Sequence, residues 1–320
     1  MSSKKQEMLR IAEKLGVSID AVEGEIKHLR LNQLKIVDLL PEMLIMVRSL
    51  ISSETFSYRR NQIGVMNKGV LISFQNILDK TEKGETFAAR NMNNRPHVRI
   101  TPSHVESEIL FPKGMHVQQI TILVELEYLK RFVGIDRNKL YYLFNTDKTF
   151  WIEEFMSPEM VILVSQLANL SLENVLSEAF YRLKALELMY MLFSNLLNRE
   201  NTEHANLSKA EINAVYLVRN AIAYSLDKSP SKDELVKLSG MTELKLRKIF
   251  TQVFGRGIYE YYNHLRMQEA AKLLKQYNLS VSEVGYKLGF SNLSYFGRLF
   301  EKHFGLKPKK WQNEYETKYK

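Results

Sequence analysis

The chain has 320 residues, 45% of them hydrophobic, which is enough for two separate globular cores. It carries a net charge of +9 and contains no cysteine, so disulfides, thiolate metal sites and cysteine nucleophiles are excluded. Its apolar runs are too short to span a bilayer and no segment has the layout of a signal peptide. We therefore expect a cytoplasmic protein without a membrane segment.

The first part of the chain has the texture of helices over residues 5–53, including an apolar-rich segment at 36–51. We expect an N-terminal helical arm over 1–54. Its beginning, MLRIAEKLGVSIDAVEGEIKHLR, also fits a helix-turn-helix that could read DNA. Gly24 would weaken the second helix of that unit by about 1 kcal/mol relative to Ala. An arm that packs on the next domain is therefore the preferred interpretation.

Residues 55–150 have a different texture, with short or alternating apolar runs such as VLISF, HVRI and VQQITILVEL between Asn, Gly and Pro clusters. This pattern predicts several short antiparallel strands, which can enclose a small ligand in a barrel. His97, His104 and His116 fall here, but their spacing matches no ligand set and no acidic residue completes one. We expect no metal and no cofactor.

Residues 157–199 return to helical periodicity, with a broad apolar stripe. The stripe is compatible with packing on the helix's own domain or with a homodimer contact through 170–198, and we favour the dimer. Residues 55–199 are thus expected to form a sensory and dimerisation domain. The polar, aperiodic segment ENTEHANLSK, residues 200–209, is the expected linker to a domain at 210–320.

The C-terminal part contains one helical pattern twice. In SKDELVKLSGMTELKLRKIFTQVFG, residues 231–255, Gly240 separates two short amphipathic helices, and Gly289 does the same within residues 278–311. Two short helices joined at a steep angle fit the major groove of DNA. The intervening IYEYYNHLRMQEAAKLLKQ predicts a long helix that would hold the two units about one DNA turn, or about 34 Å, apart.

The charge is distributed unevenly along the chain. From Ser208 onward there are 20 Lys and Arg against 11 Asp and Glu, whereas residues 1–207 hold 25 of each. All of the excess positive charge therefore lies with the two helical units, as binding to a phosphate backbone requires.

The second unit closely resembles the signature of the AraC/XylS family of bacterial transcription regulators. The resemblance covers about residues 207–311, and the signature positions are Gly289, Phe290, Ser291, Ser294, Tyr295, Phe296, Arg298, Phe300, Phe304, Gly305 and Pro308. Two positions differ from the family pattern: Gly285 stands where Ala is usual, and Gly297 where a small hydroxyl residue usually points at the DNA. Residues 157–188 (SPEM, QLAN, FYRLKALEL) are also similar to the siderophore-responsive, PchR-like branch.

The resemblance implies an α+β fold class. A cupin-like small β-barrel or strand-rich sensory domain flanked by helices would precede an all-α domain with two helix-turn-helix motifs joined by a long helix. It also implies a sequence-specific activator that pairs as a dimer. Its partners would be double-stranded promoter DNA, RNA polymerase and an unknown small-molecule effector.

The resemblance further places DNA contacts on the second helix of each unit. The expected DNA-binding residues are Glu243, Leu244, Lys245, Arg247 and Lys248 in the first unit, and Asn292, Leu293, Ser294, Tyr295, Arg298 and Lys302 in the second. Arg247 and Arg298 suit bidentate contact with guanine, and Leu293 would sense a thymine methyl. The lysines are expected at phosphates.

Two alternative functions differ in kind from a ligand-responsive activator. One is a ligand-independent regulator whose N-terminal domain only dimerises or binds a protein partner. The other is an enzyme, but the sequence has no HExxH, no GxSxG and no phosphate-cradling Gly loop. We expect that the chain is not an enzyme and has no catalytic residues.

Overall fold

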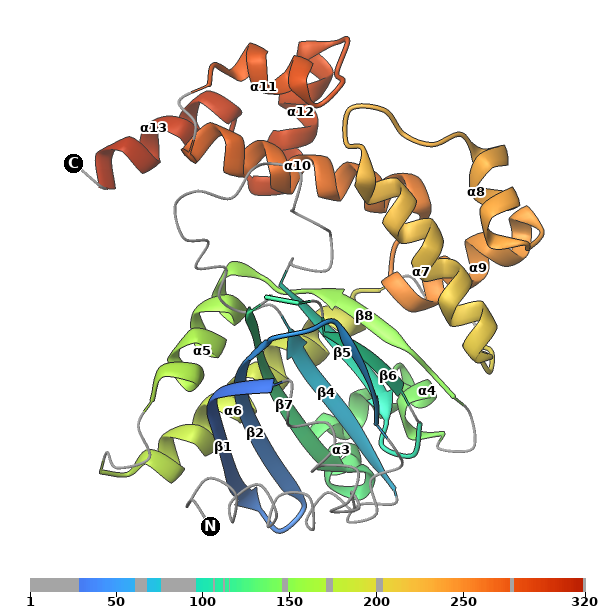
Figure 1. The fold of residues 1–320 in the computed structure, drawn as a ribbon. Coiled ribbons are helices and arrows are strands. Elements are labelled where there is room, and N and C mark those ends of the chain that lie inside the picture. Colours follow the sequence, from blue (N-terminus) through green and yellow to red (C-terminus); the bar gives the residue numbers. More distant parts are fainter. Residues whose placement is uncertain are drawn as a thin grey trace. The chain divides into compact units, whose positions relative to one another are not determined.

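The computed structural model describes residues 29–60, 68–75, 96–105, 107–111, 113–114, 116–145, 149–170, 175–199, 204–276 and 279–318. The chain divides into two compact units, Met1–Ser208 and Lys209–Lys320. The first is a mixed α+β unit and the second is helical (Figure 1).

The N-terminal unit is built on a six-stranded antiparallel sheet with the order β1-β2-β7-β4-β5-β8. Its strands are β1 (Leu29–Leu40), β2 (Met43–Ser52), β4 (Gly69–Gln75), β5 (His97–Pro102), β7 (His116–Glu125) and β8 (Ile152–Phe155). A second pair, β3 (Phe56–Arg60) and β6 (Ser107–Phe111), forms its own ladder. In the described part of the chain β1 and β8 are the two edges of the large sheet, so the sheet is open and the expected cupin-like barrel is not confirmed.

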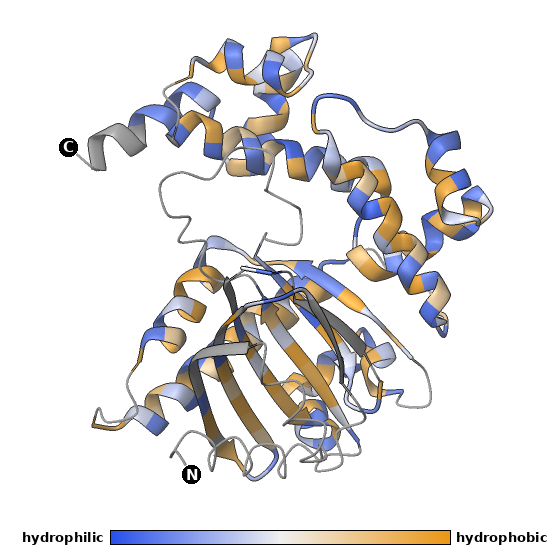
Figure 2. Ribbon diagram, in the orientation of Figure 1, coloured by the Kyte–Doolittle hydropathy of each residue, from blue (hydrophilic) through white to orange (hydrophobic). Residues whose placement is uncertain are grey.

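One face of the large sheet packs on helices and forms the core of this unit. The helices are α3 (Leu126–Val133), η4 (Gly134–Asn138), α4 (Tyr141–Phe144), α5 (Pro158–Asn169) and α6 (Ser177–Leu197). Alternate residues of the central strands, such as Ile45, Ile72 and Ile122, are completely buried in this core. The central strands are largely hydrophobic in Figure 2, as a buried sheet requires.

The expected helical arm over 1–54 is wrong for residues 29–52, which form β1 and β2; residues 1–28 lie outside the described residues. Every second residue from Met43 to Ser49 is buried, a period of two that a strand has and a helix lacks. Of the three residues between them, Leu44 and Met46 are also apolar and only Arg48 is charged, which concealed the alternation in the sequence. Pro41 and Glu42 form the tight turn between the two strands.

The C-terminal unit contains α7 (Lys209–Tyr224), α8 (Lys232–Ser239), α9 (Glu243–Phe254), α10 (Ile258–Gln276), α11 (Val281–Lys287), α12 (Leu293–Phe304) and α13 (Pro308–Lys318). Helix α10 contacts α7 and α9 as well as α11, α12 and α13. It therefore joins the two helical pairs that the sequence predicted. None of the helices that the structure describes is long and apolar enough to cross a membrane.

Candidate nucleic-acid interface

The first helix pair, α8 and α9, has well-defined ends. Ser231 and Glu234 form a capping box at the start of α8, and Gly240 ends that helix with a φ of 64°. Thr242 then caps α9 by accepting a hydrogen bond from the backbone N–H of Lys245. These local signals fix the turn between the helices, so that Leu246 and the residues one turn further along face the core while the opposite side of α9 faces solvent.

The predicted DNA-contacting residues of α9 fall into two groups. Glu243 pairs with Lys232 at 2.6 Å, and Lys245 pairs with Glu211 of α7 at 2.8 Å, so both charges are engaged within the unit. Leu244, Arg247 and Lys248 are exposed. Arg247 has no ion-pair partner among the residues that the structure describes, which leaves its guanidinium available to a base or a phosphate.

The second helix pair, α11 and α12, is closed in the same way. Ser280 and Glu283 form its capping box. Gly289 in the turn has a φ of 73°, a left-handed conformation that favours glycine. A Cβ at this position would also lie 1.9 Å from the carbonyl oxygen of Asp227, so glycine is required for space as well as for conformation. Asn292 caps α12 by accepting from the backbone N–H of Tyr295 at 2.9 Å.

The predicted contacting residues of α12 are not equally presented. Ser294, Arg298 and Lys302 are exposed along one side of the helix, whereas Leu293 is half-buried. The Cδ2 of Leu293 lies toward α11, 2.5 Å from where a Cβ on Gly285 would stand. Leu293 therefore packs inward.

Tyr295 is partly tied to its surroundings, because its ring lies 6.2 Å from that of Phe290. Its hydroxyl is hydrogen-bonded to Tyr259 of α10. Gly297 has open space beside it, with no atom within 4 Å of an added Cβ. Along α12, Arg298 is an exposed arginine without an ion-pair partner in the described ranges, the counterpart of Arg247 on α9.

The N-terminal unit holds a buried polar surface that the sequence did not predict, on the sheet face opposite the helices. Neighbouring residues across the strands pair there: Arg48 donates to Gln119 at 2.7 Å, and the hydroxyls of Ser73 and Thr121 lie 3.4 Å apart. Further residues of the same face are His97, Arg99, Thr101 and Glu153. Buried polar side chains are ordinarily hydrogen-bonded to one another, as Arg48 with Gln119 and Ser73 with Thr121 are here.

On this polar face the carboxylate of Glu153 is the central charge. Its Oε2 lies 3.8 Å from Arg99 and 3.9 Å from His97. The guanidinium of Arg99 also lies 5.1 Å from the centroid of the Trp151 ring. No signal in the sequence could have found the surface, since its residues come from strands that are far apart along the chain and its pairings depend on strand register.

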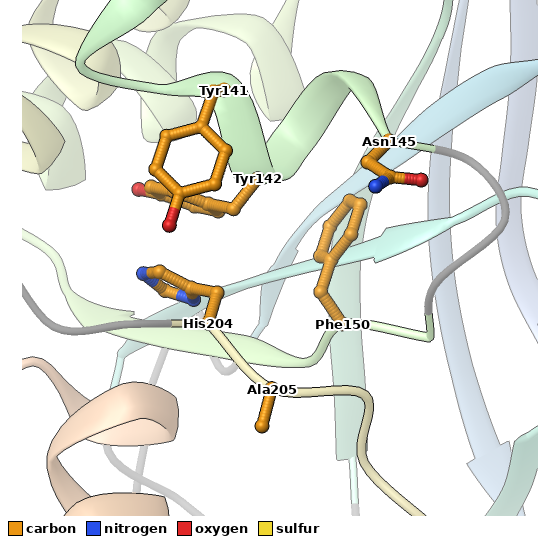
Figure 3. A pocket seen from close by; sticks show the side chains of 6 residues that line it. All are labelled: Tyr141, Tyr142, Asn145, Phe150, His204 and Ala205. Atoms are coloured by element: carbon orange, nitrogen blue, oxygen red, sulfur yellow. The ribbon is translucent and has the colours of Figure 1, made fainter.

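A shallow pocket lies where the expected linker meets the N-terminal unit (Figure 3). The ring of His204 stacks on that of Tyr142, with centroids 3.6 Å apart. The backbone N–H of Leu207 donates to the carbonyl of Thr149 at 3.1 Å, and Leu207 is buried. Burial, and then the charge of Arg199, lower the pKa of His204 to about 4, so this histidine is neutral at pH 7. Residues 204–207 are thus docked on the unit.

No three His, Asp or Glu side chains of the described residues gather as a metal site would require. His97 and His104 belong to the described part of the chain, whereas the side chain of His116 lies outside it.

Comparison with known proteins matches residues 235–314 to the model of a helix-turn-helix domain family. The chain is 38% identical over 72 residues to the uncharacterised helix-turn-helix-type transcriptional regulator YijO of Escherichia coli K12, covering 22% of this chain and 25% of YijO. It is 34% identical over 80 residues to the probable transcription factor PqrA of Proteus vulgaris, covering 25% of this chain and 66% of PqrA. The chain thus matches less than two thirds of either relative.

The chain is also 27% identical in sequence to a probable AraC family transcriptional regulator from Rhodopseudomonas palustris CGA009, whose crystal structure is known. The match covers 32% of this chain and 97% of that one, with a TM-score of 0.30. The matched curated relatives are both named as regulators or factors of transcription.

Proposed function

We propose, from the premise that the C-terminal unit of this chain is an AraC-type helix-turn-helix domain, that the whole protein is a sequence-specific DNA-binding transcription regulator. Helices α9 and α12 would each enter a major groove. One observation carries this proposal: each of the two helices presents one exposed arginine, Arg247 or Arg298, that lacks an ion-pair partner among the described side chains. Both lie in the part of the chain that holds all of the excess positive charge.

The side chains would take different roles in that complex. Arg247 and Arg298 would contact guanine O6 and N7, and Ser294 would reach a neighbouring base edge. Lys248 and Lys302 would lie at phosphates, and exposed Leu244 at the groove edge. Glu243 and Lys245 would exchange or keep their internal ion pairs on binding. Asn292 and Leu293 would act through the helix, by capping and by packing, and Tyr295 through its hydrogen bond to α10.

Regulation by a small molecule is the second part of the proposal. The buried polar face of the N-terminal sheet, with paired Arg99 and Glu153 and hydroxyls at Ser73 and Thr121, suits a ligand that both donates and accepts hydrogen bonds. Such an effector would act only through a difference in affinity for the active and inactive forms of the protein. The similarity to the siderophore-responsive branch stays a prediction about ligand class.

A thermal-shift screen of small hydroxylated and carboxylated metabolites tests the effector proposal. A compound that binds should stabilise the wild type, and it should not stabilise a Ser73→Ala/Thr121→Val variant. Because that variant removes both partners of one hydrogen bond, its own stability should change by less than about 1 kcal/mol. If no compound shifts the wild type, the ligand-independent regulator becomes the better account.

Assembly as a homodimer through α6 completes the proposal. Leu183 and Tyr190 lie on the outward side of α6 and are each 68% exposed, and Leu176, the residue just before the helix, is 76% exposed. Large apolar side chains at that spacing favour a second copy of the chain over solvent. A protein that binds promoter DNA would act in the cytoplasm, and contact with RNA polymerase would follow if it activates transcription.

The proposed sequence-specific DNA binding is tested by titrating the protein against the DNA upstream of its own and neighbouring genes. We expect binding to one segment that is at least about 10³-fold tighter than to random DNA, as specific regulators show. Equal affinity for both DNAs would contradict the proposal.

A further inference from the structure

Helix α10 is shared by the cores of both helix pairs. In its first half Tyr261 packs against Phe250 and Phe254 of α9, with ring centroids 5.4 and 5.3 Å apart. In its second half, Leu273 and Leu274 lie in the core that also contains residues of α11 and α12. The angle between the two DNA-reading helices therefore depends on how each pair is fixed to α10.

Arg266, in the middle of α10, is buried against the second pair. Its Nε and Nη2 donate to the carbonyl of Leu288 at 3.1 and 2.7 Å, and its Nη1 donates to Asn263 at 3.4 Å. The guanidinium lies 3.4 Å from the centroid of the Phe290 ring. Leu288 is the C-cap of α11, so Arg266 satisfies a carbonyl that the helix itself leaves unpaired.

No carboxylate of the described chain pairs with Arg266, which is only 7% exposed. Its contacts are a carbonyl, an amide and the faces of Phe290 and Tyr262. Burial lowers the pKa of the guanidinium, and the nearby tyrosines oppose that shift. A planar donor fork used in this way fixes the direction of the turn between α11 and α12, which a lysine could not do.

A second connection runs from the start of α10 to the first turn of α12. The hydroxyls of Tyr295 and Tyr259 are hydrogen-bonded to each other, which raises the pKa of Tyr295. Hydrogen bonds from Asn263 and then Tyr295 lower the pKa of Tyr259. Asn263 thus belongs to both connections, because it also accepts from Arg266. Tyr295, Tyr259, Asn263, Arg266 and the Leu288 carbonyl form a continuous set, which we term the α10 clamp.

We propose that the α10 clamp holds α12 at one angle to α10, so that the domain accepts only one spacing between the two DNA segments that α9 and α12 read. The inference rests on the proposed DNA-reading function and adds a geometric selectivity to it. One inserted base pair moves the second segment by about 3.4 Å and rotates it by about 35°. A domain with a fixed angle cannot follow that rotation without losing contacts of one helix.

The test compares a bound DNA site with the same site carrying one inserted base pair between its halves. The wild type should lose at least about tenfold in affinity on insertion. Tyr259→Phe and Tyr295→Phe, which delete the hydroxyl pair without changing shape, should each reduce that loss by threefold or more. Their double variant should do no more than either single variant, since both remove one interaction. Arg266→Lys should reduce the loss too, and Tyr224→Phe, an exposed tyrosine on α7, should not.

The possible outcomes separate a failure of the proposed DNA-reading function from a failure of the clamp. A wild type without specific binding would overturn the proposed function and the inference together. Specific binding with the same insertion loss in wild type and both Phe variants would overturn the inference alone. If Tyr295→Phe weakened binding to both sites equally and Tyr259→Phe changed neither, Tyr295 would be a direct DNA contact and the clamp would be wrong. Melting temperatures within about 2 °C of the wild type exclude a general loss of folding.

Discussion

Leu293 packs into the space that Gly285 leaves open: a Cβ on Gly285 would lie 2.5 Å from Leu293 Cδ2 and 3.3 Å from the Phe296 ring. Gly285 is one of the two positions at which the sequence differs from the AraC/XylS signature, and the resemblance assigns Leu293 to DNA contact. One contact links these two residues. Leu293 gains packing against α11 because position 285 has no side chain.

The two residues should therefore be coupled in stability. In a Leu293→Ala background, Gly285→Ala should stabilise the protein by up to about 1 kcal/mol, the helix propensity difference between Gly and Ala, because only the 3.3 Å approach to the Phe296 ring remains. In the wild type, Gly285→Ala should leave the free energy of unfolding unchanged or lower it, because the new Cβ forces the Leu293 side chain to move. Urea unfolding of the four proteins measures the coupling. Additive effects would contradict the contact.

Gly289 should tolerate no side chain, for two separate reasons. Gly289→Ala places a residue with a Cβ at a φ of 73° and also against the backbone carbonyl of Asp227. Gly305→Ala is the matched control, since Gly305 has the same φ of 73° and no atom within 4 Å of an added Cβ. Gly305→Ala should lower the free energy of unfolding by about 1–2 kcal/mol, the cost of a left-handed backbone conformation for a residue with a Cβ. Gly289→Ala should lower the free energy of unfolding clearly more than the control does. An equal decrease would show that the backbone of Asp227 moves aside to make room for the Cβ.

The helix-turn-helix pairs could be predicted because their signals are local. Gly240 and Gly289 end helices, and the apolar stripes follow within a few residues. The pattern of β2 resembles a helix because Leu44 and Met46 add apolar residues to the face that also carries Arg48. Contacts between distant residues, such as Arg99 with Glu153, had no sequence signal because they depend on which strands become neighbours.

The inward packing of Leu293 could not be predicted either. The periodicity of α12 alone predicts which of its residues are exposed, and it predicts that Leu293 is. The space that Leu293 fills is left by Gly285, which belongs to the preceding helix α11 and so does not enter that periodicity. The resemblance to the family therefore predicts Leu293 at the DNA, whereas in the structure its side chain packs toward α11.

Docking of residues 204–207 should depend on pH. The pKa of His204 is lowered to about 4, from an ordinary value near 6.5, so the unfolded or undocked form binds a proton more readily. The stabilisation is therefore complete above pH 6.5 and is lost as the pH falls toward 4. Hydrogen-exchange protection of the Leu207 amide, corrected for intrinsic rates, should fall in that window.

His204→Phe is the control for this prediction. It keeps a ring on Tyr142 and cannot be protonated, so protection of the Leu207 amide should become independent of pH between 6.5 and 4. The same pH dependence in this variant would assign the effect to another group.

The outward side of α6 should control the oligomeric state. Leu183→Glu or Tyr190→Glu should convert a dimer to a monomer in sedimentation velocity, because each places a charge in an apolar contact. Ile135→Glu is the control, an isolated apolar side chain of η4 that is 94% exposed. Dimers in all three variants would place the contact elsewhere, and a monomeric wild type would contradict the dimer itself.

The most direct test of DNA reading is a titration of upstream DNA and random DNA at about 50 and about 200 mM salt. It compares the wild type with Arg298→Ala and with Arg137→Ala, an arginine of η4 in the other unit. The account predicts selective binding that weakens steeply with salt. Arg298→Ala should lose about 1–3 kcal/mol on the specific site and relax its preference at one base position, with little change on random DNA. Arg137→Ala should behave as the wild type. Equal losses of Arg298→Ala on both DNAs, or no selectivity in the wild type, would contradict the account.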